Sequence, residues 1–282
     1  MNTPLMKAFA FIALFILDFF SLAVAQPYFD VAGITNWYIP GNSKTDSTSE
    51  AYATAFVSVP FNISARSKFI ISPYYENRQL KNVYSDSKIS LSSIGLPLTW
   101  RYENVDSSWS FIATLICRIN ASKLNPDENK FQTGGVFLNS FRINPKLKFK
   151  LGLYYNREFF ANYFVPLVGI EYKMHEKWQL YGVIPNSIKL EYKVSKIIYT
   201  GAVIKSITNS YRYGDRKNYY KIMDNHAGVF ADFYFPRNVC LMIEAGHTVL
   251  RNIKNRTDLS WEESKGNNFI FKAGIYYRLR FY

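Results

Sequence analysis

The chain has 282 residues, of which 18% are aromatic, and it carries a formal net charge of +13. This length suits one large β domain or two smaller ones, and the abundance of Tyr and Phe favours strands. Only two cysteines are present, Cys117 and Cys240, which excludes a disulfide scaffold. Both lie in strand-like runs and are expected to be small unpaired apolar residues, although a disulfide is the alternative in an exported chain.

The N-terminus has the organisation of a cleaved signal peptide. Met1 to Lys7 carries one positive charge, residues 8–17 form an unbroken apolar run, and an Ala-Val-Ala motif ends at Ala25. The apolar run is too short to span a bilayer comfortably as a helix, which favours a cleaved signal over an uncleaved anchor. We expect residues 1–25 to be removed and residues 26–282 to form one domain.

The remaining sequence alternates between apolar and polar residues with a period of two. In the segment 147–155 every second residue is apolar, and lysines occupy two of the four positions between them. The segment 269–281 repeats this pattern at the C-terminus. Such alternation is typical of strands whose two faces meet different media. Fourteen strands are predicted, at 28–38, 51–62, 67–76, 88–102, 109–119, 132–143, 147–157, 164–173, 178–184, 187–194, 197–208, 225–235, 239–251 and 268–282.

Short and long connections alternate between these strands. The long polar connections are 40–50, 77–87, 120–130, 157–163, 209–224 and 252–267, and the short ones are 64–66, 103–108, 144–145, 175–176, 195–196 and 236–238. A transmembrane barrel with periplasmic termini has short periplasmic turns and longer external loops. Only the tight Pro185-Asn186 link departs from this rule. If residues 178–194 instead formed one bent element, the alternation of short and long connections would fail. Fourteen strands are therefore expected, with twelve as the fallback.

Two architectures share this alternation, a soluble β domain with an apolar interior and a membrane barrel with an apolar exterior. No apolar stretch of 18 residues follows Ala25, so a membrane protein of this sequence must be a closed barrel. Tyrosine and tryptophan flank several turns, as in the aromatic girdles of such barrels; they are Tyr102, Trp109, Tyr155, Tyr163, Tyr172 and Trp178. We predict an all-β, transmembrane, antiparallel up-and-down β-barrel of about 14 strands, with a secreted soluble β protein as the alternative.

The segment 164–195 resembles a poorly characterised family of outer-membrane β-barrel proteins of Gram-negative bacteria, described as a domain of unknown function. The residues that carry the resemblance are Pro166, Gly169, Tyr172, Trp178, Leu180, Gly182, Pro185, Leu190 and Tyr192. The C-terminal strand also resembles the signal by which the barrel-assembly machinery recognises outer-membrane barrels. In that strand Phe281 is in phase with the apolar residues, whereas the final Tyr282 is not. The resemblance implies an outer-membrane location and no assigned reaction.

Catalytic and metal-binding motifs are absent from the sequence. His175, His226 and His247 lie outside any known motif. His226 with Ser210 or Asp224 is a candidate for a lipid-modifying hydrolase site, but any polar rim of a barrel offers such pairs, so this signal is not specific. The acidic pairs 127–128 and 262–263 lack a third ligand at fixed spacing, so solvated loop acids are favoured over weak calcium or lipopolysaccharide-bridging sites. We expect a protein that is not an enzyme and has no cofactor or metal.

The basic residues have a defined place if the apolar faces meet lipid. A charge on the lipid face would cost about 2 to 4 kcal/mol at the bilayer midplane, so the cations must face the lumen or its rims. The candidates are Lys148, Lys150, Lys189, Lys193, Lys272, Arg278 and Arg280. Glu171, Glu191, Asp232 and Glu244 would offset part of this charge. Because the cations alternate with an apolar face, a nucleic-acid-binding surface is not indicated.

The sequence therefore leads to three expectations for function. The first is a narrow passive pore, or a transport element for a small anionic solute, with a basic lumen. The second is a structural or surface-interaction barrel whose lumen is filled by salt bridges, and the third is an outer-membrane lipid hydrolase. In each case the expected surroundings are outer-membrane lipid and lipopolysaccharide.

Overall fold

The structure is a computed structural model that describes residues 27–41, 47–84, 87–124, 130–214, 218–257 and 260–281. The expected signal peptide, the acidic pair 127–128 and Tyr282 lie outside these residues. Among the described residues, no helix is long and apolar enough to cross a membrane.

Almost all of the described chain is in strands. Their bounds are β1 Tyr28–Ile39, β2 Ser49–Val57, β3 Val59–Ser64, β4 Ser67–Ile71, β5 Tyr74–Val83, β6 Ser87–Glu103, β7 Trp109–Ala121, β8 Phe131–Asn144, β9 Leu147–Arg157, β10 Asn162–Lys173, β11 Trp178–Ile184, β12 Ser187–Lys193, β13 Ile198–Arg212, β14 Tyr219–Phe235, β15 Val239–Thr248, β16 Asn252–Arg256, β17 Trp261–Lys265 and β18 Phe269–Arg280. Four consecutive pairs continue one another across short interruptions: β2 with β3, β4 with β5, β15 with β16, and β17 with β18.

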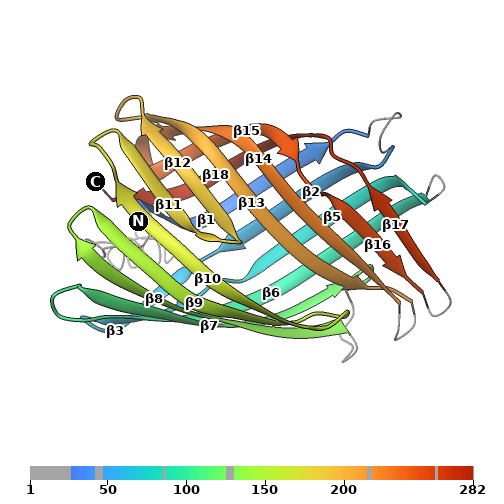
Figure 1. Ribbon diagram of the computed structural model, residues 1–282, viewed down its shortest axis with the longest axis horizontal. Coiled ribbons are helices and arrows are strands. Elements are labelled where there is room, and N and C mark those ends of the chain that lie inside the picture. The colour runs from blue at the N-terminus through green and yellow to red at the C-terminus, as the bar shows by residue number, and fades with distance from the viewer. Residues whose placement is uncertain are drawn as a thin grey trace, which may run out of the picture.

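The strands close into a single barrel (Figure 1). Antiparallel pairing runs through β1, β2, β5 and then β6 to β15 in chain order, continues to β18, and returns from β18 to β1. The chain is thus an all-β, closed, fourteen-stranded antiparallel barrel, as the alternation predicts. The two-residue link at Pro185-Asn186 is a true hairpin between β11 and β12, so the twelve-strand fallback is not needed.

The barrel has its apolar residues outside and its charges inside. On β9, Phe149 and Leu151 are 44% and 54% exposed, whereas Lys150 between them is 2% exposed. β18 repeats the arrangement, with Phe271 and Ile275 exposed and Arg278 buried. A soluble β domain would show the reverse, so the exposed apolar face is the one that meets lipid.

Aromatic side chains gather at the end of the barrel that carries the short turns, hereafter the turn end. Trp100 packs edge-on against Phe111 with ring centroids 4.9 Å apart, and Trp178 lies 4.7 Å from Tyr192. Amphipathic rings of this kind form the interfacial girdles of membrane barrels. The opposite end, which carries the longer connections, is hereafter the loop end.

The structure corrects several predicted boundaries at the loop end. β5 continues to Val83 and β13 to Arg212, and the predicted connection 252–267 contains the β16–β17 hairpin. Beyond the lipid neither face of a strand needs to be apolar, so the alternation that marks a strand disappears. β1 alternates poorly in sequence for a different reason, because a bulge between Asp30 and Ala32 shifts its faces by one residue.

The β11–β12 hairpin is much shorter than its neighbours. β11 and β12 have 7 residues each, whereas β10 has 12 and β13 has 15. A glycine permits the close strand approach in this hairpin, since a Cβ on Gly182 would lie 2.2 Å from the Ser187 carbonyl oxygen. Figure 1 shows β10 and β13 continuing past the end of the hairpin.

Beyond this hairpin β13 crosses toward β7. The Ser206 amide donates to the Asn186 carbonyl at the hairpin tip (2.9 Å), and the Ser122 amide donates to the Arg212 carbonyl (2.9 Å). Arg212 also forms a parallel bridge with Ala121 of β7. β13 therefore leaves the cylindrical wall at the loop end and rests against the inner side of the β7–β10 wall.

Candidate functional site

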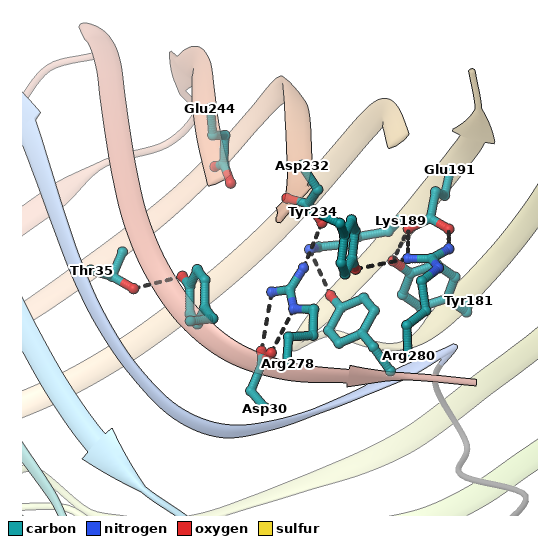
Figure 2. A network of polar contacts seen from close by, with 12 residues as sticks. Asp30, Thr35, Tyr181, Lys189, Glu191, Asp232, Tyr234, Glu244, Arg278 and Arg280 are labelled. Atoms are coloured by element: carbon teal, nitrogen blue, oxygen red, sulfur yellow. Dashed lines mark hydrogen bonds and ion pairs between the residues drawn. The ribbon is translucent and has the colours of Figure 1, made fainter. Parts of the chain in front are cut away.

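Arg278 of β18 is the centre of an ion-paired network inside the barrel (Figure 2). Its Nε and Nη2 donate to the Asp30 carboxylate of β1 at 2.5 and 3.1 Å, and its Nη1 donates to Asp232 of β14 at 2.5 Å. Arg278 and Asp232 are 3% and 0% exposed. A buried guanidinium held by two carboxylates is electrostatically satisfied and fixes three strands relative to one another.

Arg280 extends the network across the lumen. It donates to both carboxylate oxygens of Glu191 on β12, and its Nη1 lies 3.0 Å from the Tyr234 hydroxyl. Tyr181 of β11 also donates to Glu191 (3.1 Å). β18 and β12 are not neighbours in the sheet, so these contacts connect separate parts of the wall across the lumen near the turn end.

Two further predicted lumen lysines lie in the same half of the barrel. Lys189 donates to the Tyr28 hydroxyl (3.0 Å) and stands 4.8 Å above the Phe230 ring. Lys272 pairs with Glu244 at 3.4 Å. Both cations are therefore held by neighbouring acceptors or rings.

The other three predicted lysines lie toward β9, β10 and β12. Lys150 and Lys148 pair with Glu171 of β10 at 2.7 and 3.5 Å. Lys193 lies near the turn end and lines the cavity described next. At least six of the seven predicted cations are thus held by a carboxylate, a hydroxyl or a ring, and three of the seven, Lys148, Lys193 and Arg280, line this cavity.

A cavity of about 440 Å³ opens at the turn end. Its charged lining residues are Arg142, Lys148, Lys173, Lys177, Lys193, Arg280, Glu176 and Glu191. Cations outnumber carboxylates there, and Glu191 is already bound by Arg280. Within the described part of the chain, the buried Arg142 Nε has no hydrogen-bond partner. An unpaired guanidinium donor and an excess of cations are features of a site for anions.

A second ion-paired cluster fills the barrel toward the loop end. Arg78 donates to Glu50 (2.6 Å) and Asp224, and Arg251 donates to Glu50 (3.0 Å). All four side chains are at most 5% exposed. Trp37 donates to Glu50 at 2.9 Å. Two apolar clusters also fill this end; they consist of Leu80, Val83, Leu91, Tyr211, Tyr220, Ile222 and Ile253, and of Trp37, Ile39, Tyr52 and Ile270.

A third cluster is built around Glu158, in the link between β9 and β10. Its carboxylate accepts bonds from Arg118, Gln132 (3.0 Å) and the Ser210 amide (3.0 Å). The sequence analysis does not predict that the clusters around Arg78 and Glu158 fill the interior.

One signal of the covering by Glu158 is present in the sequence: the outer face of β13 changes from apolar to polar at Ser206.

The hydrolase candidates are not brought together. His226 pairs with Glu244 at 2.9 Å on the inner face of β14. Ser210 lies on the opposite face of β13, where its hydroxyl bonds to Glu158, and Asp224 is held by Arg78 and Arg251. The arrangement therefore contains no Ser-His pair at these positions.

The described residues also contain no group of three or more metal-ligating side chains. Glu263, one of the predicted loop acids, accepts a bond from Asn252 and pairs with Lys254 and Lys265, both at 3.1 Å. These partners lower the pKa of Glu263 to about 2. The Glu263 carboxylate thus stays ionised, and these two lysines balance its charge. Cys117 and Cys240 are both free.

Comparison with known proteins identifies the sequence family and the fold. The profile of the domain of unknown function DUF6268 matches residues 74–279, which confirms the resemblance noted above. No curated protein has a significantly similar sequence.

Similar solved structures are outer-membrane barrels. The COG4313 outer membrane channel of Pseudomonas putida F1 superposes with a TM-score of 0.51 at 10% identity, covering 89% of this chain and 94% of the channel. The NanC porin has a TM-score of 0.42 at 8% identity over 87% and 98% of the two chains. The KdgM porin, solved with disordered oligogalacturonate, has a TM-score of 0.37 at 11% identity over 89% and 99%. The first of these supports the fold.

Proposed function

The chain belongs to the family of the domain of unknown function DUF6268, and we propose that it is a narrow passive channel of the outer membrane that prefers small anions. The observation that carries this proposal is the cationic cavity at the turn end. Its charged lining has more Lys and Arg than Glu, and Arg142 has an unpaired buried donor. A cavity lined by one sign of charge concentrates ions of the opposite sign.

Cationic groups continue from this cavity into the barrel. Lys150 and Arg101 are 2% and 8% exposed and lie on the inner faces of β9 and β6. Each has a carboxylate beside it, Glu171 and Glu103 respectively. Successive inward cations would offer an anion one partner after another, and the carboxylate beside each cation would keep the binding weak enough for the anion to leave. The narrow, ion-paired interior would limit the size of the anion.

A structural barrel without transport is the second candidate. The cluster of Glu50, Arg78, Asp224 and Arg251, together with the two apolar clusters, fills the loop end. A filled lumen would make the barrel a rigid support for its external connections. Conductance separates the two candidates directly.

The test is electrical recording from the purified protein in planar bilayers under a KCl gradient. We expect small, discrete conductance steps. The reversal potential should lie closer to the equilibrium potential of chloride than to that of potassium. Absence of conductance from protein that shows folded, heat-modifiable migration would favour the structural barrel.

Charge reversal at the turn end tests the selectivity. A permeating ion and a side-chain charge 4 Å apart in water interact by about 1 kcal/mol. The double variant Lys148→Glu/Lys177→Glu is therefore expected to reduce the chloride-to-potassium permeability ratio by roughly three- to tenfold. Lys88→Glu is the matched control, because Lys88 is exposed at the loop end of β6. Equal effects of the two changes would contradict selection at the turn-end cavity.

A further inference from the structure

The barrel wall is incomplete above the β11–β12 hairpin. β10 pairs with β11 only from Val168 to Lys173, so its outer segment, Asn162 to Leu167, pairs with β9 alone. β13 pairs with β12 only as far as Lys205. Among the described residues, β10 and β13 have no strand pairing with each other. Pro166 lies in the open segment of β10, where a residue without an N–H is tolerated.

A cavity of about 400 Å³ lies behind this opening. The inner faces of β7 to β10 contribute one wall, and the hairpin tip and β13 contribute the other. The lining residues are Ile116, Val136, Leu138, Tyr154, Tyr163, Val165, Leu167, Val183, Pro185, Asn186, Ser206, Ile207, Thr208 and Asn209. This set, which lies wholly in the described chain, contains no charged residue. The cavity differs in this respect from the ion-paired interior around Arg278.

The opening lies at the level of the lipid. On β10 the exposed apolar row includes Val168, opposite the end of β11, and continues to Phe164, which is 63% exposed. Phe164 packs against Tyr155 of β9, another residue of the outer face. The apolar exterior therefore extends beyond the hairpin tip on this side of the opening. A molecule dissolved in the membrane would meet the cavity without first crossing the ion-paired lumen.

The cavity is covered on its loop-end side. The Phe159 amide donates to the Ser210 hydroxyl (3.0 Å), and Glu158 binds Arg118 and Gln132 behind it. Arg212 stacks over Phe159 at 4.2 Å. These contacts hold the β9–β10 link over β13. The side opening between β10 and β13 is thus the less obstructed approach.

We propose that this cavity binds a small, uncharged, predominantly apolar molecule that enters sideways from the membrane. Its size is that of a ligand pocket, and apolar lining with a few hydroxyl and amide groups is the usual composition of such pockets. Tyr154 and Tyr163 present rings on which a planar aromatic molecule can pack. The absence of charge in the lining disfavours an anion. This activity is separate from the anion conductance proposed above and does not depend on it.

Equilibrium binding of radiolabelled naphthalene to the protein in phospholipid nanodiscs tests the proposal. Protein-free nanodiscs measure the linear partitioning into lipid, which is subtracted. We expect a saturable component of one naphthalene per protein. Val165→Trp, which fills the cavity, should weaken this component at least tenfold. A complete lack of saturable binding would overturn the proposal.

Val168→Trp is the matched control. Val168 is on the same strand but faces lipid, with 54% exposure, so its replacement should leave naphthalene binding unchanged. Equal weakening by both variants would place the binding on the lipid face and overturn the cavity assignment. The proposed ligand class would instead be overturned by native mass spectrometry that shows one phospholipid retained by the wild type, lost in Val165→Trp and not displaced by naphthalene. Both variants must show the same heat-modifiable migration as the wild type.

Discussion

The two halves of β13 differ in what covers their outer face. From Ile198 to Lys205 the strand has a neighbour on each side, and Ile204 on its outer face is 60% exposed. From Ser206 to Arg212 it pairs with β14 and is covered by the β9–β10 link, and Ser210 on that outer face is fully buried. The change from apolar to polar outer residues therefore marks the point at which protein replaces lipid.

The largest expected effect is on the covered half. Glu158→Ala would leave the buried Arg118 guanidinium without its carboxylate, and breaking a buried ion pair costs about 3 to 5 kcal/mol. We expect a loss of this size in the free energy of unfolding, measured by urea titration in phospholipid vesicles with tryptophan fluorescence. Glu176→Ala, in an exposed turn, is the control and should change little. A loss below about 1 kcal/mol, the value of an ordinary exposed pair, would contradict the assigned role of Glu158.

The second effect concerns the half of β13 that faces lipid. Ile204→Lys would place a charge on the apolar exterior, which costs about 2 to 4 kcal/mol at the bilayer midplane and less near the interfaces. The same urea titration measures the loss. Ile204→Met keeps the apolar character and should cost less than about 1.5 kcal/mol. Comparable stability of the two variants would mean that Ile204 does not meet lipid.

The smallest effect is expected at the end of the covered half. Arg212→Leu removes the stacking over Phe159, and a cation–π contact of this kind is worth about 0.5 to 1 kcal/mol when partly exposed. If Arg212 instead faced lipid, leucine would stabilise the barrel. The sign of the change in urea midpoint therefore distinguishes the two environments.

Strand alternation was sufficient to predict the barrel. Strands such as β9 and β18 cross the lipid, and lipid demands an apolar residue at every second position on one face. The same demand assigns Lys150 and Arg278 to the other face. Outside the lipid this constraint ends, which explains why the ends of β5 and β13 and the β16–β17 hairpin were predicted as connections.

The interior clusters could not be predicted in the same way. Arg78, Glu50, Asp224 and Arg251 come from distant parts of the sequence and meet only because the sheet closes. No local spacing identifies which inward cation pairs with which inward carboxylate. Likewise, the polar outer face of β13 indicates that Ser210 is covered by protein, but nothing in the sequence identifies Glu158 as the residue that covers it.

Local periodicity is enough to predict the all-β class, the fourteen strands and their apolar faces, because each of these follows from a period of two that lipid imposes. The family follows separately from the particular residues of the segment 164–195. Three features appear only in the folded barrel. β13 bends inward past a short hairpin, the inward charges pair across the lumen, and an uncharged cavity lies between β10 and β13. These features depend on the relative lengths of neighbouring strands and on contacts across the closed barrel, which no single strand encodes.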